Sequence, residues 1–423
     1  MITYNQLTGL FFMLGFAILI IIISTAIRRY FKEGFQNSSA YKQDKEYTAQ
    51  VKLLSDKYSA DANGKRPVTA YPDTDMPQEE RAFVNYYALG CRFTGYLGPM
   101  NNGYYDVDIG VQTAVNAGCR VFVLEIDYID SCETDVFYPR ITIRDSQGKL
   151  AMNRDSIEPL CNSAQASSIR DVCDKINFYA FSSCQNNTDP VVVVLYFVRQ
   201  PPGAYNSKVV LDFFANVAKS LSPLKDRLLK NEINGGTYYR QKQEGQLLIN
   251  NLDTYNDKVL IFSNANTNGF REMQYPINED LDYMVNLRLS YTQQPLGVTE
   301  NKTSSLFGIL DTTDSYMIIP DNKVNDTIEQ TKLRWTICFS KDPSVTVPLE
   351  TYKTIATKFG VHCIPAVLFD DASSFMFTDS LFKRYSFLPK PAPLRYKKPA
   401  VVTPAEPSNT TDAKGGSLRE PTI

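Results

Sequence analysis

The sequence has few of the residues on which several classes of protein depend. Among its 423 residues there is one histidine, His362, and one tryptophan. No two of the eight cysteines form a C-x-x-C pair, so the spacing of zinc fingers and related metal sites is absent. The net charge is −2 and the pI is near 5.7, so the chain lacks the general basic field of nucleic-acid-binding proteins. We therefore expect no nucleic acid among its partners.

The cysteines are expected to be buried thiols, because a domain of this size can be stabilised by its apolar core without a disulfide framework. In an oxidising compartment, Cys173 and Cys184 could pair, a question the sequence leaves open. The eight positions are Cys91, Cys119, Cys132, Cys161, Cys173, Cys184, Cys338 and Cys363.

The N-terminal segment lacks charge. Residues 1–27 contain no Asp, Glu, Lys or Arg, and residues 7–27 (LTGLFFMLGFAILIIIISTAI) are almost wholly apolar. A helix of about 20 apolar residues spans a bilayer and satisfies its own backbone polar groups. A cleaved signal peptide is disfavoured because the segment has no basic start and no small-residue cleavage site. The sequence predicts a short N-terminal segment (1–6) and a single transmembrane helix (7–27).

The charges after this span predict its orientation. Arg28, Arg29 and Lys32 follow it directly and nothing basic precedes it, so the positive-inside rule places the large C-terminal part on the cytoplasmic side. Asn-x-Ser/Thr triplets favour the opposite orientation, because such triplets are glycosylated in secreted chains. They begin at Asn37, Asn186, Asn301, Asn325 and Asn409.

Composition divides the rest of the chain into segments. Residues 28–80 are polar and are predicted to form a stalk with a short helix near 45–58. Residues 81–398 form the folded domain, in which 264–332, rich in Asn, Thr and Tyr, are predicted to be an irregular or inserted element. Residues 399–423 are Pro- and Thr-rich and have too few apolar side chains to offset the entropy of ordering, so we expect a disordered tail.

Strand and helix patterns alternate through the folded domain. Continuous β-branched runs suit strands that are covered on both faces. Such runs occupy 121–126 and 191–198, with shorter ones at 259–262, 336–339 and 366–369; helical patterns occupy 172–180, 210–217 and 352–359. Repeated strand-then-helix order predicts an α/β fold with a parallel sheet. At this length the sheet is expected to form a TIM-like (β/α) barrel, either regular or distorted.

Four segments in order resemble a known family. They are VQTAVNAGCRVFVLEIDYID, then DVCDKINFYAF with DPVVVVLYF, then LLINNLDTYNDKVLIFSN, and finally FGVHCIPAVLFDD with FKRYSFLPKPAPLR. Together they resemble the X-type catalytic barrel of phosphatidylinositol-specific phospholipase C, over residues 85–395 with 264–332 unmatched. The resemblance implies a phospholipase C-like phosphodiesterase barrel.

The family's catalytic residues are missing from this chain. The resemblance implies two histidines, one that activates the inositol 2-hydroxyl and one that assists at the phosphate, because imidazole exchanges protons near neutral pH. Met100 stands where the first is expected, residues 138–144 contain none, and His362 near the start of the last strand matches neither. The family's late carboxylate falls at Tyr196 or Phe197 and its phosphate-binding lysine near Phe262. The chain thus resembles a degenerate member, a pseudoenzyme of the phosphoric diester hydrolase class.

The family's calcium ligands are matched by Asn101, Glu125 and Asp127. Residues i and i+2 of a strand share a face, so the two carboxylates can converge. Oxygen ligands suit Ca²⁺ or Mg²⁺. In the alternative interpretation, the carboxylates are paired with Arg120, Arg140 or Arg144.

Of three functions, the sequence favours the first, for which the third is a compatible setting; the second is the alternative. The first is a non-catalytic binding or structural module beside a membrane, with phospholipid head groups or another protein as partner. The second is a divergent metal-dependent hydrolase of phospholipids or glycerophosphodiesters, in which Arg140 and Arg144 bind the phosphate. The third is a structural protein of a virion membrane, because RRYFKEGF after the anchor resembles membrane proteins of large DNA viruses. Tyrosines around the expected barrel mouth could bind lipid or pack internally. These are Tyr86, Tyr87, Tyr96, Tyr104 and Tyr105.

Overall fold

The protein is described by a computed structural model. Most of the folded domain is covered, but the predicted transmembrane helix 7–27 (except Gly15), segment 1–6 and tail 399–423 lie outside the described residues. The described residues are 15, 39–58, 64–72, 76–129, 137–152, 167–229, 232–233, 236–237, 245–291, 307–340, 342, 347–370 and 381–398. Within these ranges no helix is both long and apolar enough to cross a bilayer.

A curled parallel sheet forms the centre of the described fold, and eight parallel strands are found there. In spatial order they are β14 (Ala366–Val367), β2 (Gly90–Arg92), β5 (Val121–Asp127), β7 (Val191–Phe197), β10 (Val259–Ser263), β11 (Leu287–Tyr291), β12 (Phe307–Thr312) and β13 (Thr336–Phe339). Backbone hydrogen bonds also join β13 to residues 362–363, just before β14. The sheet is therefore consistent with a distorted TIM-like barrel, as predicted.

The two longest strands show why the sheet is buried on both faces. In β5, Val121 and Val123 belong to the apolar cluster inside the curl, whereas Phe122 and Leu124 belong to the cluster beneath the helices. Alternate residues of a strand point to opposite faces, so a strand covered on both sides needs a continuous apolar run. β7 follows the same rule, which explains its VVVVLYF sequence.

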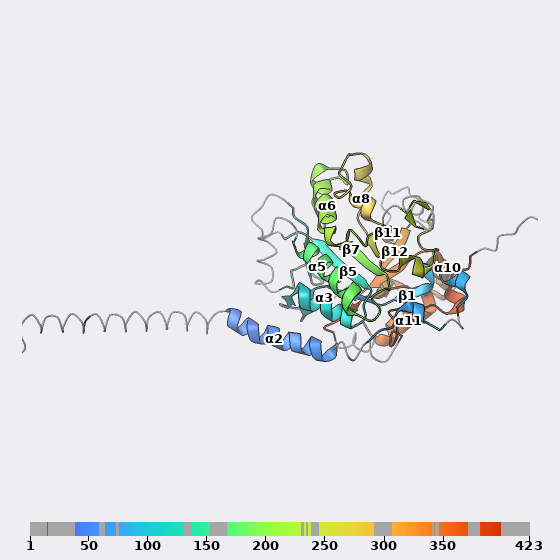
Figure 1. The fold of residues 1–423 in the computed structure, drawn as a ribbon, viewed down its shortest axis with the longest axis horizontal. Coiled ribbons are helices and arrows are strands. Elements are labelled where there is room, and N and C mark those ends of the chain that lie inside the picture. Colours follow the sequence, from blue (N-terminus) through green and yellow to red (C-terminus); the bar gives the residue numbers. More distant parts are fainter. Residues whose placement is uncertain are drawn as a thin grey trace, which may run out of the picture.

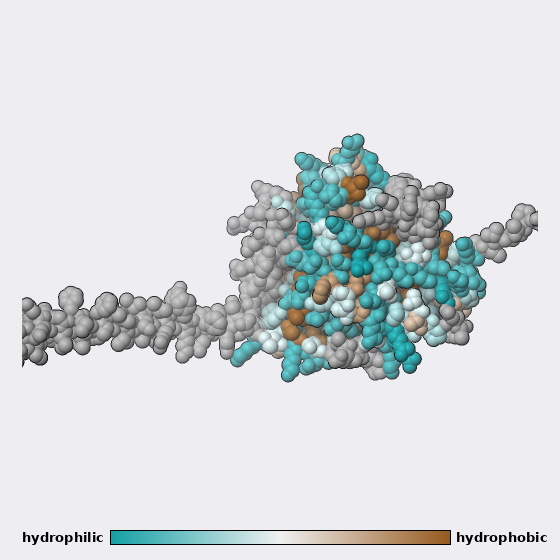
Figure 2. Space-filling model, viewed as in Figure 1, coloured by the Kyte–Doolittle hydropathy of each residue, from teal (hydrophilic) through white to brown (hydrophobic). Residues whose placement is uncertain are grey.

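Helices cover the outside of the sheet (Figure 1). They are α3 (Val107–Asn116), α5 (Ser167–Phe178), α6 (Lys208–Ser220), α8 (Leu281–Met284), α9 (Thr313–Met317), α10 (Val324–Leu333) and α11 (Leu349–Phe359). Asp106 caps α3 by accepting a hydrogen bond from the Ile109 amide. Gly360 ends α11 in the left-handed conformation, φ 73°, as its sequence predicts. The face seen in Figure 2 is largely hydrophilic, with apolar side chains only in small groups.

Short strands complete the domain. β1 (Tyr86–Ala88) pairs with β15 (Phe387–Pro389), β3 (Tyr96–Gly98) with β4 (Tyr104–Tyr105), β8 (Glu232–Ile233) with β9 (Gly236–Thr237), and β6 (Arg140–Ile141) with the end of β5, all antiparallel. At the amino end of the barrel, Phe83 packs edge-on against Tyr255 and Phe262. These buried rings fill part of the space inside the amino end of the barrel.

The described part of the predicted stalk is packed on the barrel. Residues Ser39–Lys57 form α2, in which the Gln50 amide donates to the Leu97 carbonyl, 2.6 Å. Tyr58 follows the helix, is buried, and donates to the Leu368 carbonyl, 2.8 Å. Leu54 of α2 is also buried, in the apolar cluster beneath the helices. The expectation of a polar stalk over 28–80 is thus corrected for its described part, because apolar residues of α2 face the domain.

The described part of 264–332 also differs from the prediction of an irregular or inserted element. It contains two barrel strands, β11 and β12, the helices α8 and α9, and most of α10. The strand sequences LRLSY and FGILDT carry polar residues among the apolar ones, so neither gives the continuous run that marks β5 and β7.

Candidate binding site at the barrel mouth

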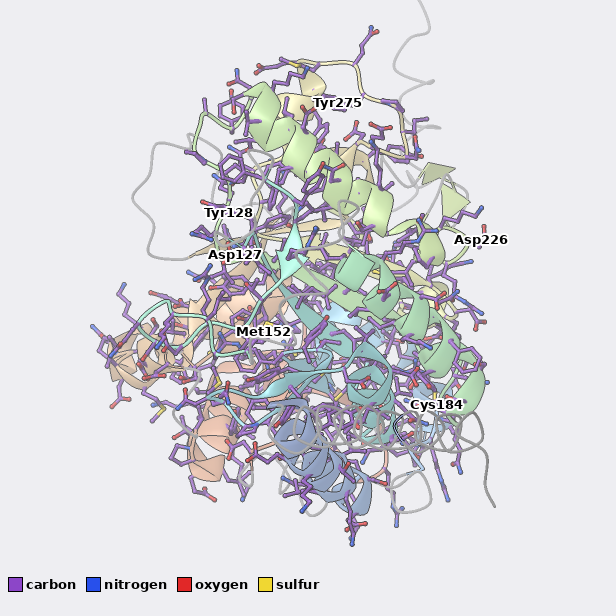
Figure 3. All side chains as sticks on the ribbon, turned by 90° about the vertical axis from the view of Figure 1, so that its left-hand side faces the viewer. Asp127, Tyr128, Met152, Cys184, Asp226 and Tyr275 are labelled. Atoms are coloured by element: carbon purple, nitrogen blue, oxygen red, sulfur yellow. The ribbon has the colours of Figure 1, made fainter. Side chains whose placement is uncertain are left out.

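The candidate site lies at the carboxyl ends of β2, β5 and β7, which we call the barrel mouth. This end carries the functional residues in β/α barrels, because the loops after the strands converge there. Glu125 and Asp127 continue the inward-facing series of Val121 and Val123 along β5. Figure 3 shows Asp127 and Tyr128 together at the end of this strand.

Glu125 is held by an arginine from the neighbouring strand. Nε of Arg92 lies 2.5 Å from Oε1 of Glu125, and the two side chains are only 9% and 4% exposed. The Arg92 guanidinium also donates to the Ser340 carbonyl, 3.0 Å, and lies over the rings of Phe93 and Phe339, at 4.6 and 5.2 Å. Burial raises the pKa of Glu125, and the Arg92 charge opposes that shift.

Asp127 is fully buried and has two arginine partners. Nε of Arg199 lies 2.7 Å from Oδ1, and Nε of Arg144 donates to Oδ2. The Tyr128 amide also donates to Oδ1, at 2.6 Å. The guanidinium carbon of Arg199 lies 3.9 Å from the centre of the Tyr128 ring. Two carboxylates and three arginines give this group of side chains a net charge of +1.

The mouth does not fit a divalent cation. A metal requires carboxylate lone pairs that face a common point, but here both carboxylates are directed to guanidinium groups. Asn101, the third predicted ligand, lies in the exposed turn between β3 and β4. Over the described ranges, no three His, Cys, Asp or Glu side chains are arranged to hold a metal ion. The alternative interpretation, in which an arginine pairs with these carboxylates, is found for Arg144, which pairs with Asp127. It is not found for Arg120, which donates to the Ala180 carbonyl.

The two predicted phosphate-binding residues are placed differently. Arg144 reaches the mouth and its side chain is 14% exposed. Arg140 belongs to β6, is buried, and donates to the Pro139 carbonyl; burial lowers its pKa to about 10. Sequence reasoning missed Arg92 and Arg199. Each stands where a parallel strand ends, a signal that could have identified both once β2 was recognised.

The only histidine lies away from the mouth. His362 precedes β14 and is buried beside Trp335; its Nδ1 accepts a hydrogen bond from the Thr336 amide, 2.9 Å. Nε2 lies 2.7 Å from both the Val84 carbonyl and Nζ of Lys390. Burial, followed by the Lys390 charge, lowers the pKa of His362 well below its usual value. His362 therefore contributes to closing the amino end of the barrel.

Other expectations for the mouth region are also resolved. Met100, which stands in the sequence where the first family histidine is expected, lies in the turn after β3. The residue that follows the first barrel strand, β2, at the mouth is Phe93. The tyrosines are packed rather than presented to solvent: Tyr86, Tyr87, Tyr96 and Tyr104 are buried and Tyr105 is half-buried.

Comparison with known proteins identifies a class of neighbours. No family model matches the chain, and no curated protein matches it. Solved structures that resemble it are PLC21 of L. pealei (16% identity, 75% of this chain and 38% of that chain, TM-score 0.47) and PLC21 of S. officinalis (16%, 76% and 38%, 0.45). A third is the calcium-dependent phosphoinositol-specific phospholipase C of a Pseudomonas sp. (10%, 74% and 97%, 0.43). These neighbours belong to the family that the sequence resembles, and at such identities they assign no activity to this chain.

Proposed function

We propose that the domain is a non-catalytic module that binds a phosphate-bearing anion, such as a phospholipid head group, at the barrel mouth. The observation that carries this proposal is the arrangement around Asp127. One buried carboxylate orients two guanidinium groups, so a positive charge remains for a ligand. Arginine binds phosphate well because its planar fork gives charge-assisted hydrogen bonds.

Arg199 is the residue that we expect to meet the ligand. Its side chain is 34% exposed, whereas the Asp127 that holds it is fully buried. Its Nη2 donates to the Tyr128 carbonyl, 2.7 Å, and its face is stacked on the Tyr128 ring. A guanidinium fixed in this way loses little conformational entropy when an anion binds.

The non-catalytic part of the proposal rests on the titratable groups. Phosphodiester cleavage requires groups that exchange protons near neutral pH. The chain's single histidine is buried at the amino end of the barrel, and both carboxylates of the mouth are in ion pairs. The chain is therefore expected to bind its ligand without turning it over.

Metal-dependent phosphoric diester hydrolysis is the second candidate. One observation favours it: Glu125 and Asp127 lie two residues apart on the same face of β5 at the mouth. Glu125 and Asp127 would hold the metal only if it displaced the arginines that now pair with them, and it would then supply an activated water for hydrolysis. The assay is turnover of phosphatidylinositol and glycerophosphodiesters with Ca²⁺. Turnover that Glu125→Ala abolishes would establish this candidate and refute the first.

The proposed setting is a membrane, with the domain on the cytoplasmic side. Burial of the asparagine of one Asn-x-Thr triplet supports that side, since Asn186 is inaccessible and donates to Oγ of Ser386, 2.8 Å. A glycan on this nitrogen would remove a buried hydrogen bond. This membrane could be that of a virion, and fractionation of infected or expressing cells tests that setting. Recovery in virus particles supports a virion membrane protein. Recovery only in cellular membranes opposes the virion setting.

Calorimetric titration of the full chain in detergent with inositol 1-phosphate tests the binding proposal. Arg199→Met should abolish the binding heat. Arg227→Met is the matched control, because Arg227 is 33% exposed and pairs with Asp257 away from the mouth. Absence of binding by the unaltered chain, or equal binding by R199M, would refute the proposal.

A further inference from the structure

We infer that Arg92 is a built-in cation, occupying the place at which the mouth would otherwise hold a divalent ion. The inference concerns the Glu125 half of the mouth. It does not depend on the proposed binding of an anion at Asp127, so the two can fail separately.

The position of Arg92 is set by the pairing of the first two barrel strands. Gly90 and Cys91 of β2 pair in register with Val121 and Phe122 of β5. Arg92 is the next residue, and its long side chain extends along β5 to Glu125. The cation therefore arises from strand register within the barrel and not from a surface loop.

The partners of Arg92 are those that a hard cation prefers. Its guanidinium bridges a carboxylate, that of Glu125, and a backbone carbonyl, that of Ser340. Carboxylate and carbonyl oxygens, completed by water, are the ligands of Ca²⁺. With the arginine in place, one positive charge already lies between these oxygens, and a divalent ion would be repelled.

The surroundings hold this cation rigidly. The Phe93 and Phe339 rings lie 4.6 and 5.2 Å from the guanidinium carbon, and such cation–π contacts strengthen where water is excluded. A methionine at position 92 keeps an unbranched apolar chain near the two rings but removes the charge. Such a substitution should therefore expose a cation site made from residues already present.

Terbium luminescence of the full chain in detergent provides the test, because a tyrosine near bound Tb³⁺ sensitises its emission. Tyr196 pairs in register with Glu125, and its ring is 5.1 Å from that of Phe339. Arg92→Met should bind Tb³⁺ at least about tenfold more tightly than the unaltered chain. Ca²⁺ should displace the Tb³⁺, and the double variant R92M/E125Q should lose the site.

The matched control is Arg395→Met, since Arg395 and Glu80 form an ion pair of similar burial, 9% and 14% exposed. R395M should bind Tb³⁺ no better than the unaltered chain. If R92M unfolds without metal, recovery of its cooperative thermal transition in Ca²⁺ supports the inference, and failure to recover overturns it. A folded R92M that binds like R395M, or an unaltered chain that binds as tightly as R92M, also overturns it.

Discussion

Removing Arg92 should produce a large loss of stability that depends on pH. Breaking a buried ion pair by deleting one partner costs about 3–5 kcal/mol, because the other charge is left buried without compensation. The side chains of Arg92 and Glu125 are 9% and 4% exposed, so solvent screens this pair little. We expect Arg92→Met to lower the free energy of unfolding near neutral pH by about that amount.

The pH dependence follows from Glu125. Burial already raises its folded pKa, and deletion of Arg92 removes the charge that opposes this shift. The folded variant therefore binds a proton more tightly than the unfolded chain, so its stability rises as pH falls through the folded pKa. The deficit relative to the unaltered chain should be largest near neutral pH and should shrink under mildly acidic conditions.

Urea denaturation of the unaltered chain, R92M, E125Q and R92M/E125Q provides the assay. The double variant replaces both charges and should be more stable than R92M alone, because no uncompensated charge remains. An R92M loss below about 1 kcal/mol at every pH would refute the reasoning, since exposed ion pairs contribute no more than that. Additivity of the two single effects would refute it as well.

Three further changes should alter stability in defined directions. Burial raises the pKa of Asp189 to about 6, so the stability of the unaltered chain should rise as pH falls through that value; Asp189→Asn should flatten this slope in urea denaturation. Burial lowers the pKa of Lys390, so its contribution makes stability rise with pH; Lys390→Met should weaken that rise, measured by thermal unfolding across alkaline buffers. Gly360→Ala should cost about 1–2 kcal/mol, because φ is positive there, and an unchanged melting temperature would contradict this.

The parts of the fold that could be predicted are those with strong local patterns. β5 and β7 are continuous β-branched runs, and α11 has both an apolar face and a terminating Gly360. β2 has three residues, GCR, and β11 reads LRLSY, so neither has a pattern that stands out from a loop. Both are strands because neighbours in the sheet supply their hydrogen bonds, a tertiary effect that propensity does not contain.

The candidate site could be predicted only in part for the same reason. Glu125 and Asp127 could be identified because the resemblance matches them to calcium ligands, and their spacing on one strand predicts a common face. Their partners Arg92 and Arg199 come from strands β2 and β7, or directly after them, and meet the carboxylates only because the sheet curls. A local pattern thus gave the carboxylates, whereas the charges that neutralise them depend on long-range pairing.

Parallel calorimetric titrations of the unaltered full chain with Ca²⁺ and with inositol 1-phosphate test the central claim most directly. The three arginines and two carboxylates of the mouth predict that the phosphate binds and that Ca²⁺ does not. Calcium binding that Glu125→Gln abolishes, with no heat from the phosphate, would contradict the account.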